Sequence, residues 1–450
     1  MVRDMTAGSP SKILVTFALP MILGNVFQQL YNIVDSVVVG NFVGSDALAA
    51  VGASYPVTFL FIAVATGASI GCSVVISQFY GAKRITEMKS SVFTALTSMM
   101  TLSALLLLAG LLLARPLLLL MRTPGNIFSD ADAYLRIYVA AVPFLFLYNT
   151  STAAFNALGD SRTPLWLLML SSVTNIFLDL LFVIRFGMGV PGVAWATLIA
   201  QALASLLAFF VLLRRLRRMP CEGKPHVFEC ERLRHICRVA VPSIVQQSIV
   251  SFGALFVQAL VNGYGSDVIA GYTAATKIDS IAIMPMLNVG NAVSSFTAQN
   301  IGAAKPGRVG KGLRAAVVMS AVIGGATTAV LWGFGPQFVG LFVDSSANAA
   351  VIAAGVEYLT VVSLFYAVMG IMCDFNGVLR GAGDMKVFMI GTLGNFSARV
   401  VLAYTLAAFI GEAAVWWSIP MGWTIGLVIA AARFFSGGWK TKSIIEDAPH

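Results

Sequence analysis

The sequence predicts an all-α integral membrane protein whose twelve transmembrane helices form two pseudo-symmetric six-helix bundles, related as parallel repeats. Three observations support this fold class. Of the 450 residues, 58% are hydrophobic and only 11% are charged, whereas a soluble domain carries about a quarter charged residues. Many apolar runs reach the roughly 20 residues that a helix needs to cross a bilayer. Several blocks of sequence also recur in the second half of the chain.

The apolar runs are expected to be helices rather than barrel strands. Backbone groups in lipid must be hydrogen-bonded within the protein, and no alternating strand pattern occurs. The first run is preceded by a short polar stretch and is too long for a signal peptide, so we expect no cleavable signal. The predicted spans cover residues 13–38, 48–77, 91–114, 131–156, 164–185, 191–213, 238–262, 270–297, 315–335, 351–378, 387–409 and 413–435.

The basic residues predict the orientation. Most of the 29 Lys and Arg fall in segments that these spans place on one side, above all in the stretch 214–238, "RRLRRMPCEGKPHVFECERLRHICR". The positive-inside rule therefore places both termini in the cytoplasm. Membrane lipids account for the net charge of +9, and no nucleic-acid partner is expected. The five cysteines match no disulfide or zinc pattern, so we predict no bound metal.

Four blocks recur at a spacing of about 220 residues, which indicates an internal repeat. The pairs are "ALPMILGNVFQQ" with "AVPSIVQQSIVS", "VGSDALAAVGA" with "YGSDVIAGYTA", "SQFYGAKR" with "AQNIGAAKPGR", and "FNALGDSRTP" with "VLRGAGDMKV". We predict an N-terminal lobe (1–219), a cytoplasmic linker (220–237) and a C-terminal lobe (238–450). Because each lobe has an even number of spans, the repeats are parallel, and such paired bundles are typical of alternating-access transporters.

Charged residues inside spans are costly, and they mark functional sites unless they are paired. In the first span, Asn25, Gln28, Asn32 and Asp35 share one helix face, and Pro20 is expected to open or kink the helix. The charged residues within the predicted spans are Asp35, Asp179, Lys277, Asp279, Asp374 and Arg399.

The N-terminal lobe carries a candidate proton or cation site. Asn175 and Asp179 are spaced i, i+4 in the fifth span, and the sixth span contributes Thr197. Two buried carboxylates resist double ionisation, so one of them is expected to carry a proton. Alternatively, their oxygens with those of the amides and hydroxyls suit a hard cation such as sodium. A plainer interpretation is that these side chains only form interhelical hydrogen bonds that hold the helices together.

The C-terminal lobe lacks this acidic pair. Val257 matches the position of Asp35, and Arg399 matches that of Asn175. We expect Lys277 and Arg399 either to neutralise Asp279 and Asp374 or to serve in substrate binding or coupling. The matched acids of the short turns, Asp160 and Asp384, are expected to cap helices or hold the turn.

The ordered motifs "ALP…Q…NIVDSVVVG", "YGAKR", "LGDSRTP", "NIFLD", "AQNIGAAK" and "LRGAGD" resemble the multidrug and toxic compound extrusion (MATE) family, closest to its DNA-damage-inducible efflux branch. The resemblance runs over residues 9–435. It implies a monomeric exporter of the bacterial inner membrane that exchanges amphipathic, cationic compounds for protons or sodium ions, and that is neither an enzyme nor a cofactor binder. The positions that resemble the family's N-lobe cation site are Asp35, Gln28, Asn149, Asn175, Asp179 and Thr197.

We assign Gln28, Asn32, Lys277 and Asp279 to substrate binding, and Pro20, Arg399 and Asp374 to structure or coupling. Protons are the favoured coupling ion, because two carboxylates lie in apolar surroundings. One rival function is a flippase for lipid-linked precursors. An intramembrane enzyme is disfavoured because we expect the spans to hold no HExxH motif, no G-x-S-x-G nucleophile and no metal-ligand cluster. A passive channel is disfavoured because no filter sequence occurs.

Overall fold

The computed structural model describes residues 4–342 and 349–445, and every regular element in these ranges is helical. The longer helices are α1 (Pro10–Val38), α2 (Ser45–Gly81), α3 (Ile85–Leu120), α4 (Gly125–Ala157), α5 (Arg162–Leu180), α6 (Gly189–Arg218), α7 (Cys230–Val261), α8 (Ser266–Ala282), α9 (Met284–Gly302), α10 (Pro306–Gly340), α11 (Ala349–Ser363), α12 (Tyr366–Ala382), α13 (Met385–Ile410) and α14 (Ala413–Phe435). The short elements are two π-helical turns, Val39–Val43 and Leu181–Arg185, and a 3₁₀ turn, Asn262–Tyr264.

The described helices supply the predicted number of spans. Eleven segments are long and apolar enough to cross a membrane, and the bent pair α11–α12 makes a twelfth. The predicted span 270–297 corresponds to α8 and α9 together, which separate where Pro285 enters the first turn of α9. The predicted span 351–378 corresponds to α11 and α12, whose axes differ by 49°. The predicted all-α, multi-span fold class is thus confirmed.

The described chain divides into two compact units. The first contains Leu23–Ile244, and the second contains Asp4–Ile22 and Val245 onward. The division cuts α1 and α7 just after Pro20 and Pro242, which lie inside these helices. The first part of α1 therefore belongs to the second unit, and the first part of α7 belongs to the first.

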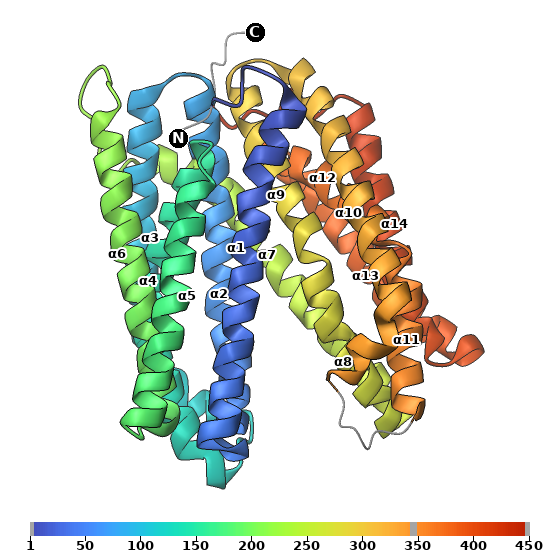
Figure 1. The fold of residues 1–450 in the computed structure, drawn as a ribbon. Helices are drawn as coiled ribbons and strands as arrows, with labels where there is room; N and C mark the ends of the chain where they lie inside the picture. Colours follow the sequence, from blue (N-terminus) through green and yellow to red (C-terminus); the bar gives the residue numbers. More distant parts are fainter. Residues whose placement is uncertain (1–3, 343–348, 446–450) are drawn as a thin grey trace. The chain divides into compact units, whose positions relative to one another are not determined.

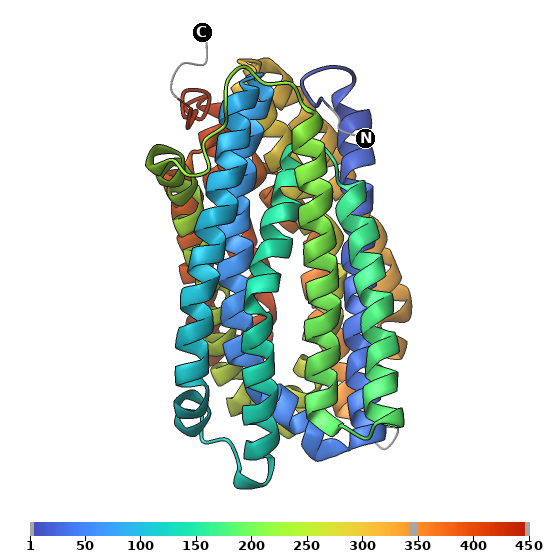
Figure 2. The same cartoon turned by 90° about the vertical axis from the view of Figure 1, so that its left-hand side faces the viewer.

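In the first unit, α4 packs against α2, α3 and α6 (Figures 1 and 2). Two glycines one turn apart allow α2 to approach the first part of α7. A Cβ atom on Gly67 would lie 2.7 Å from Ile244 Cα, and one on Gly71 would lie 2.8 Å from the carbonyl oxygen of Ile236. Small residues at i, i+4 are a common means of close helix packing in membranes.

The same stretch, "GASIG" (67–71), matches the G-x-S-x-G pattern of serine hydrolases. It lies in the middle of α2 rather than at the strand-to-helix turn that the hydrolase mechanism requires. The hydroxyl of Ser69 donates to the carbonyl of Ala65, 2.7 Å away in the same helix. The glycines of this pattern therefore serve helix packing.

In the second unit, α12 packs against α9, α10 and α14. A Cβ atom on Gly290 of α9 would lie 2.8 Å from the carbonyl oxygen of Cys373. Gly377 and Gly381 of α12 face α9 in return, and Cβ atoms there would overlap the carbonyl oxygens of Gly290 and Ser294. These glycines thus set the separation of the two helices.

Corresponding turns of the two repeats are each held by an ion pair between an aspartate and an arginine. Asp160 Oδ1 accepts the backbone N–H groups of Arg162 and Thr163, both at 3.1 Å, and Oδ2 forms an ion pair with Arg215 of α6. The prediction that Asp160 caps a helix or holds the turn is confirmed for the turn before α5. In the second unit, Asp384 Oδ2 accepts a bond from Arg433 Nε of α14 at 2.6 Å.

Replacing Gly381 by Leu should destabilise the second unit, because the side chain has no space between α12 and α9. We expect the unfolding free energy in detergent to fall by about 1–3 kcal/mol, measured by thermal unfolding of the purified protein. Gly325→Leu is the control, since a Cβ atom there meets nothing within 4 Å. Equal stability of the two variants would contradict the close packing described here.

Replacing Asp160 by Asn should lower stability by roughly 1.5–3 kcal/mol, because charge-assisted hydrogen bonds are lost. Burial by itself would raise the pKa of Asp160, but the hydrogen bonds from Thr163 and Arg215 outweigh burial and hold this pKa below its usual value. The carboxylate therefore stabilises the fold above about pH 4, and the contribution disappears as the pH falls through the lowered pKa.

The measurement is the unfolding free energy of wild type and Asp160→Asn across this pH range. The difference between the two should shrink as the pH falls. Asp132→Asn is the control, because Asp132 pairs with the exposed Arg136 of the same helix and such surface pairs contribute about 0–1 kcal/mol. A difference that stays constant with pH would show that Asp160 does not act through its charge.

Candidate functional site

Two carboxyl groups meet inside the first unit. Asp35 lies on α1 and Asp179 on α5, and their side chains are within hydrogen-bonding reach of each other. Asp179 is fully buried, and none of the donor groups in the described residues hydrogen-bonds to either of its oxygens. No ion pair joins a described Lys or Arg to these two acids. The structure thus brings together the acidic pair that the sequence singled out.

The amide and hydroxyl partners lie on the next two helices. Asn175 is buried one turn before Asp179 on α5, and its Nδ2 donates to Thr197 Oγ1 of α6 at 3.4 Å. Asn175 Oδ1 accepts no hydrogen bond from the described residues. The α5 stripe therefore presents several buried oxygen atoms that no described donor satisfies, which is a suitable environment for a proton or a hard cation.

The other predicted residues of this lobe lie elsewhere on its helices. Gln28 and Asn32 are exposed side chains of α1, and Asn32 Nδ2 donates to Gln29 Oε1 at 3.1 Å. Asn149 donates to the carbonyl of Leu145 in its own helix at 2.9 Å. Roles for Gln28, Asn32 and Asn149 in binding remain predictions.

Two tyrosines lie near the acidic pair, and the sequence argument did not single them out. Tyr31, one turn before Asp35, interacts electrostatically with both acids, and so does Tyr134 of α4. Tyr134 stacks on Tyr138 with ring centroids 6.2 Å apart. The i, i+4 spacing of Tyr134 and Tyr138 indicates in the sequence that they share a helix face. Only the packing of α4 shows where that face lies.

Each acid also stands just before a π-helical turn. Val39–Val43 follows Asp35, Leu181–Arg185 follows Asp179, and the two turns contact each other. Such turns often occur at functional sites because they change the helix register locally. A buried apolar cluster that includes Val39, Val183 and Tyr134 packs around them. The acids therefore lie next to an apolar, close-packed end of the unit.

The second unit surrounds its first buried acid with aromatic groups. Asp279 of α8 accepts hydrogen bonds from the hydroxyls of Tyr366 at 2.6 Å and Tyr358 at 3.4 Å. It also interacts electrostatically with Arg399, but no described ion pair joins the two, so neutralisation of Asp279 by Arg399 stays a prediction. The site is a carboxylate held by hydroxyl donors rather than a pair of acids.

The prediction that Lys277 neutralises Asp279 is wrong. Lys277 Nζ lies over the ring of Phe342, 5.9 Å from its centroid, and forms no ion pair with Asp279 among the described residues. Residues at i and i+2 point to different sides of a helix, which explains the separation. Asp374 of α12 is fully buried beside Ser320, and no described ion pair joins it to Lys277 or Arg399.

Comparison with known proteins gives a consistent result. A family model described as MatE matches residues 20–181 and, separately, residues 242–405, so each match begins at the proline of one repeat. The probable multidrug resistance protein YpnP of Bacillus subtilis (strain 168) is 29% identical over 445 residues, covering 99% of each chain. The probable multidrug resistance protein YoeA of the same strain is 32% identical over 443 residues, covering 95% of this chain and 94% of the relative.

A solved structure is also similar. A MOP superfamily transporter from Pyrococcus furiosus superposes with a TM-score of 0.90 at 25% sequence identity, over 97% of this chain and 98% of the other.

The proximity of the two acids can be tested without measuring activity. In a cysteine-free background, the pair Asp35→Cys and Asp179→Cys should form a disulfide under mild oxidation, or bridge through Cd²⁺. The control pairs Asp35→Cys with Ser172→Cys, because Ser172 is buried on α5 about 10 Å farther along the helix. Cross-linking is read by mass spectrometry of proteolytic fragments. Equal cross-linking of both pairs, or of neither, would contradict the geometry described.

Proposed function

Because the chain belongs to the MatE family, we propose that it is a secondary active multidrug exporter that moves amphipathic, cationic compounds out of the cell in exchange for protons. The relatives carry multidrug resistance names, which supports this substrate class. The eleven or twelve candidate spans of the described chain support a multi-pass bacterial membrane protein. Both termini are proposed to be cytoplasmic, from the distribution of basic residues.

One observation supports the proton proposal above others: the carboxyl groups of Asp35 and Asp179 lie within hydrogen-bonding reach. Two carboxylates repel each other, whereas a carboxylic acid and a carboxylate share a hydrogen bond. The pair is therefore suited to gain and lose one proton as a unit. Sodium would instead need several of the nearby oxygens to converge, and it is retained as an outcome of the test.

We propose that the charge of this pair couples drug release to proton entry. With the pair ionised, the first unit attracts a cationic compound. When a proton binds, the negative charge falls and the compound is released to the outside. A ligand shifts a conformational equilibrium only through its different affinity for the two states. Because the drug and the proton compete for the same negative charge on Asp35 and Asp179, each has a different affinity for the two states.

The drug is proposed to contact the exposed polar face of α1, where Gln28 and Asn32 lie on the same helix as Asp35. In the second unit, Lys277 and Asp279 remain candidate substrate contacts, and Arg399, Asp374 and Pro20 remain candidates for structural or coupling roles. The protein is proposed to act as a monomer without a cofactor.

The test is efflux of a cationic dye from proteoliposomes under an imposed pH gradient or an imposed sodium gradient. Asp35→Asn and Asp179→Asn should each lower pH-driven efflux by about tenfold or more, because the coupling free energy is lost. Asp46→Asn is the control, since this exposed acid lies at the start of α2, and it should transport like wild type.

Unimpaired efflux by both Asp35→Asn and Asp179→Asn would move the coupling site elsewhere. Efflux driven by sodium but not by a pH gradient would replace the proton with sodium at the same site. Efflux that neither gradient drives would reject coupled export, and transfer of a fluorescent lipid-linked sugar between leaflets would then indicate a flippase.

A further inference from the structure

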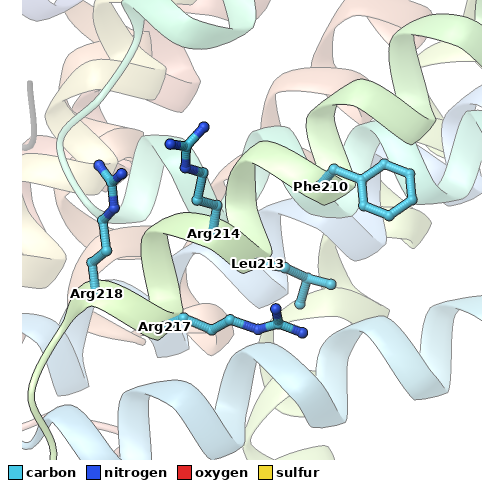
Figure 3. Close-up of a pocket in the computed structure, with 5 residues that line it drawn as sticks. All are labelled: Phe210, Leu213, Arg214, Arg217 and Arg218. Carbon is cyan, nitrogen blue, oxygen red and sulfur yellow. The ribbon is translucent and has the colours of Figure 1, made fainter.

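The three exposed arginines at the end of α6 line an open hollow that the export proposal does not use. Its volume is about 480 Å³, and its lining residues are Arg214, Arg217, Arg218, Phe210 and Leu213 (Figure 3). Arg214 and Arg218 extend from the same side of the helix on successive turns. The lining of the hollow therefore combines three positive charges with two apolar side chains.

The arginines at the end of α6 differ in the direction of their side chains. Arg215 is turned inward, where it forms an ion pair with Asp160 and lies over the ring of Phe155, 5.1 Å from the centroid. Arg214, Arg217 and Arg218 are exposed, and no described acid forms an ion pair with them. Their charge is thus available to an external anion, because the local acid is already occupied.

The same helix face continues into the membrane as an apolar stripe. Its exposed members are Ile199, Leu203, Leu206 and Phe210. They are spaced by three or four residues, so they follow one face of α6 toward Arg214. One leaflet of hydrocarbon is about 15 Å thick, which about ten residues of helix cross. The stripe from Ile199 to Phe210 is about that long, so it spans roughly the depth of one leaflet below the arginines.

We propose that this end of α6 is a binding site for an anionic phospholipid. The guanidinium groups of Arg214, Arg217 and Arg218 bind the phosphodiester oxygens of the headgroup, because the planar fork of arginine suits phosphate. The acyl chains lie along Phe210, Leu206 and Leu203. A free phosphate ion would use only the arginines, whereas a phospholipid uses both the charge and the apolar stripe.

The experiment is native mass spectrometry of the full-length protein, titrated with phosphatidylglycerol, phosphatidylcholine or inorganic phosphate. Wild type should retain phosphatidylglycerol in preference to phosphatidylcholine. The double variant Arg214→Gln/Arg217→Gln should lose affinity for phosphatidylglycerol by about tenfold, because two basic contacts are removed. Arg214→Lys/Arg217→Lys keeps the charge and the predicted topology, and it should bind more tightly than the Gln variant and less tightly than wild type.

The matched control is Lys311→Gln/Arg314→Gln, which removes two exposed basic residues with the same three-residue spacing on α10. The control should bind phosphatidylglycerol like wild type. Equal losses in the control and the arginine variant would reduce the effect to general surface charge and overturn the proposal. Unchanged binding in the Gln variant, or full displacement of the lipid by millimolar inorganic phosphate, would overturn it as well.

Discussion

Asp35 and Asp179 meet between α1 and α5 of the first unit without a described basic partner, and the surrounding helices must make this contact tolerable. An unpaired charge within a membrane span costs about 2.5–3.5 kcal/mol on insertion scales. No lysine or arginine of the described residues forms an ion pair with either acid to lower this cost. It places tyrosines and an amide nearby and leaves the carboxyl groups to each other. This arrangement is what the proposed exchange of a proton requires, because a permanent ion pair would hold the carboxylates in their charged form.

The second unit shows the alternative solution to the same problem. Asp279 accepts hydrogen bonds from two tyrosine hydroxyls and lies close to Arg399. An acid held in this way has satisfied oxygen atoms and a nearby positive charge. The two repeats nevertheless hold corresponding turns in the same way. The ion pair is Asp160–Arg215 in the first repeat and Asp384–Arg433 in the second. The repeated unit thus preserves its turn chemistry while its buried carboxylates differ.

Close helix packing is the second constraint on the architecture. Lipid gives no hydrophobic driving force between helices, so contact depends on small residues and complementary surfaces. Gly67 and Gly71 serve this purpose in the first unit, and Gly377 and Gly381 serve it in the second. The glycines of "GASIG" show how a motif changes meaning with its context. Inside a membrane helix the same residues that would shape a hydrolase turn instead bring two backbones together.

The sequence by itself determined the number of spans, the helical class, the internal repeat and the acidic residues to examine, because hydropathy, periodicity and the cost of buried charge are local properties. It did not determine partners between helices. Only the tertiary structure decided that Asp35 meets Asp179, that Lys277 turns toward Phe342 instead of Asp279, and that Tyr31 and Tyr134 adjoin the acids. The π-helical turns and the inward direction of Arg215 were also decided there. A helical pattern specifies which residues share a face, whereas the rotation and neighbours of that face depend on how all the helices pack.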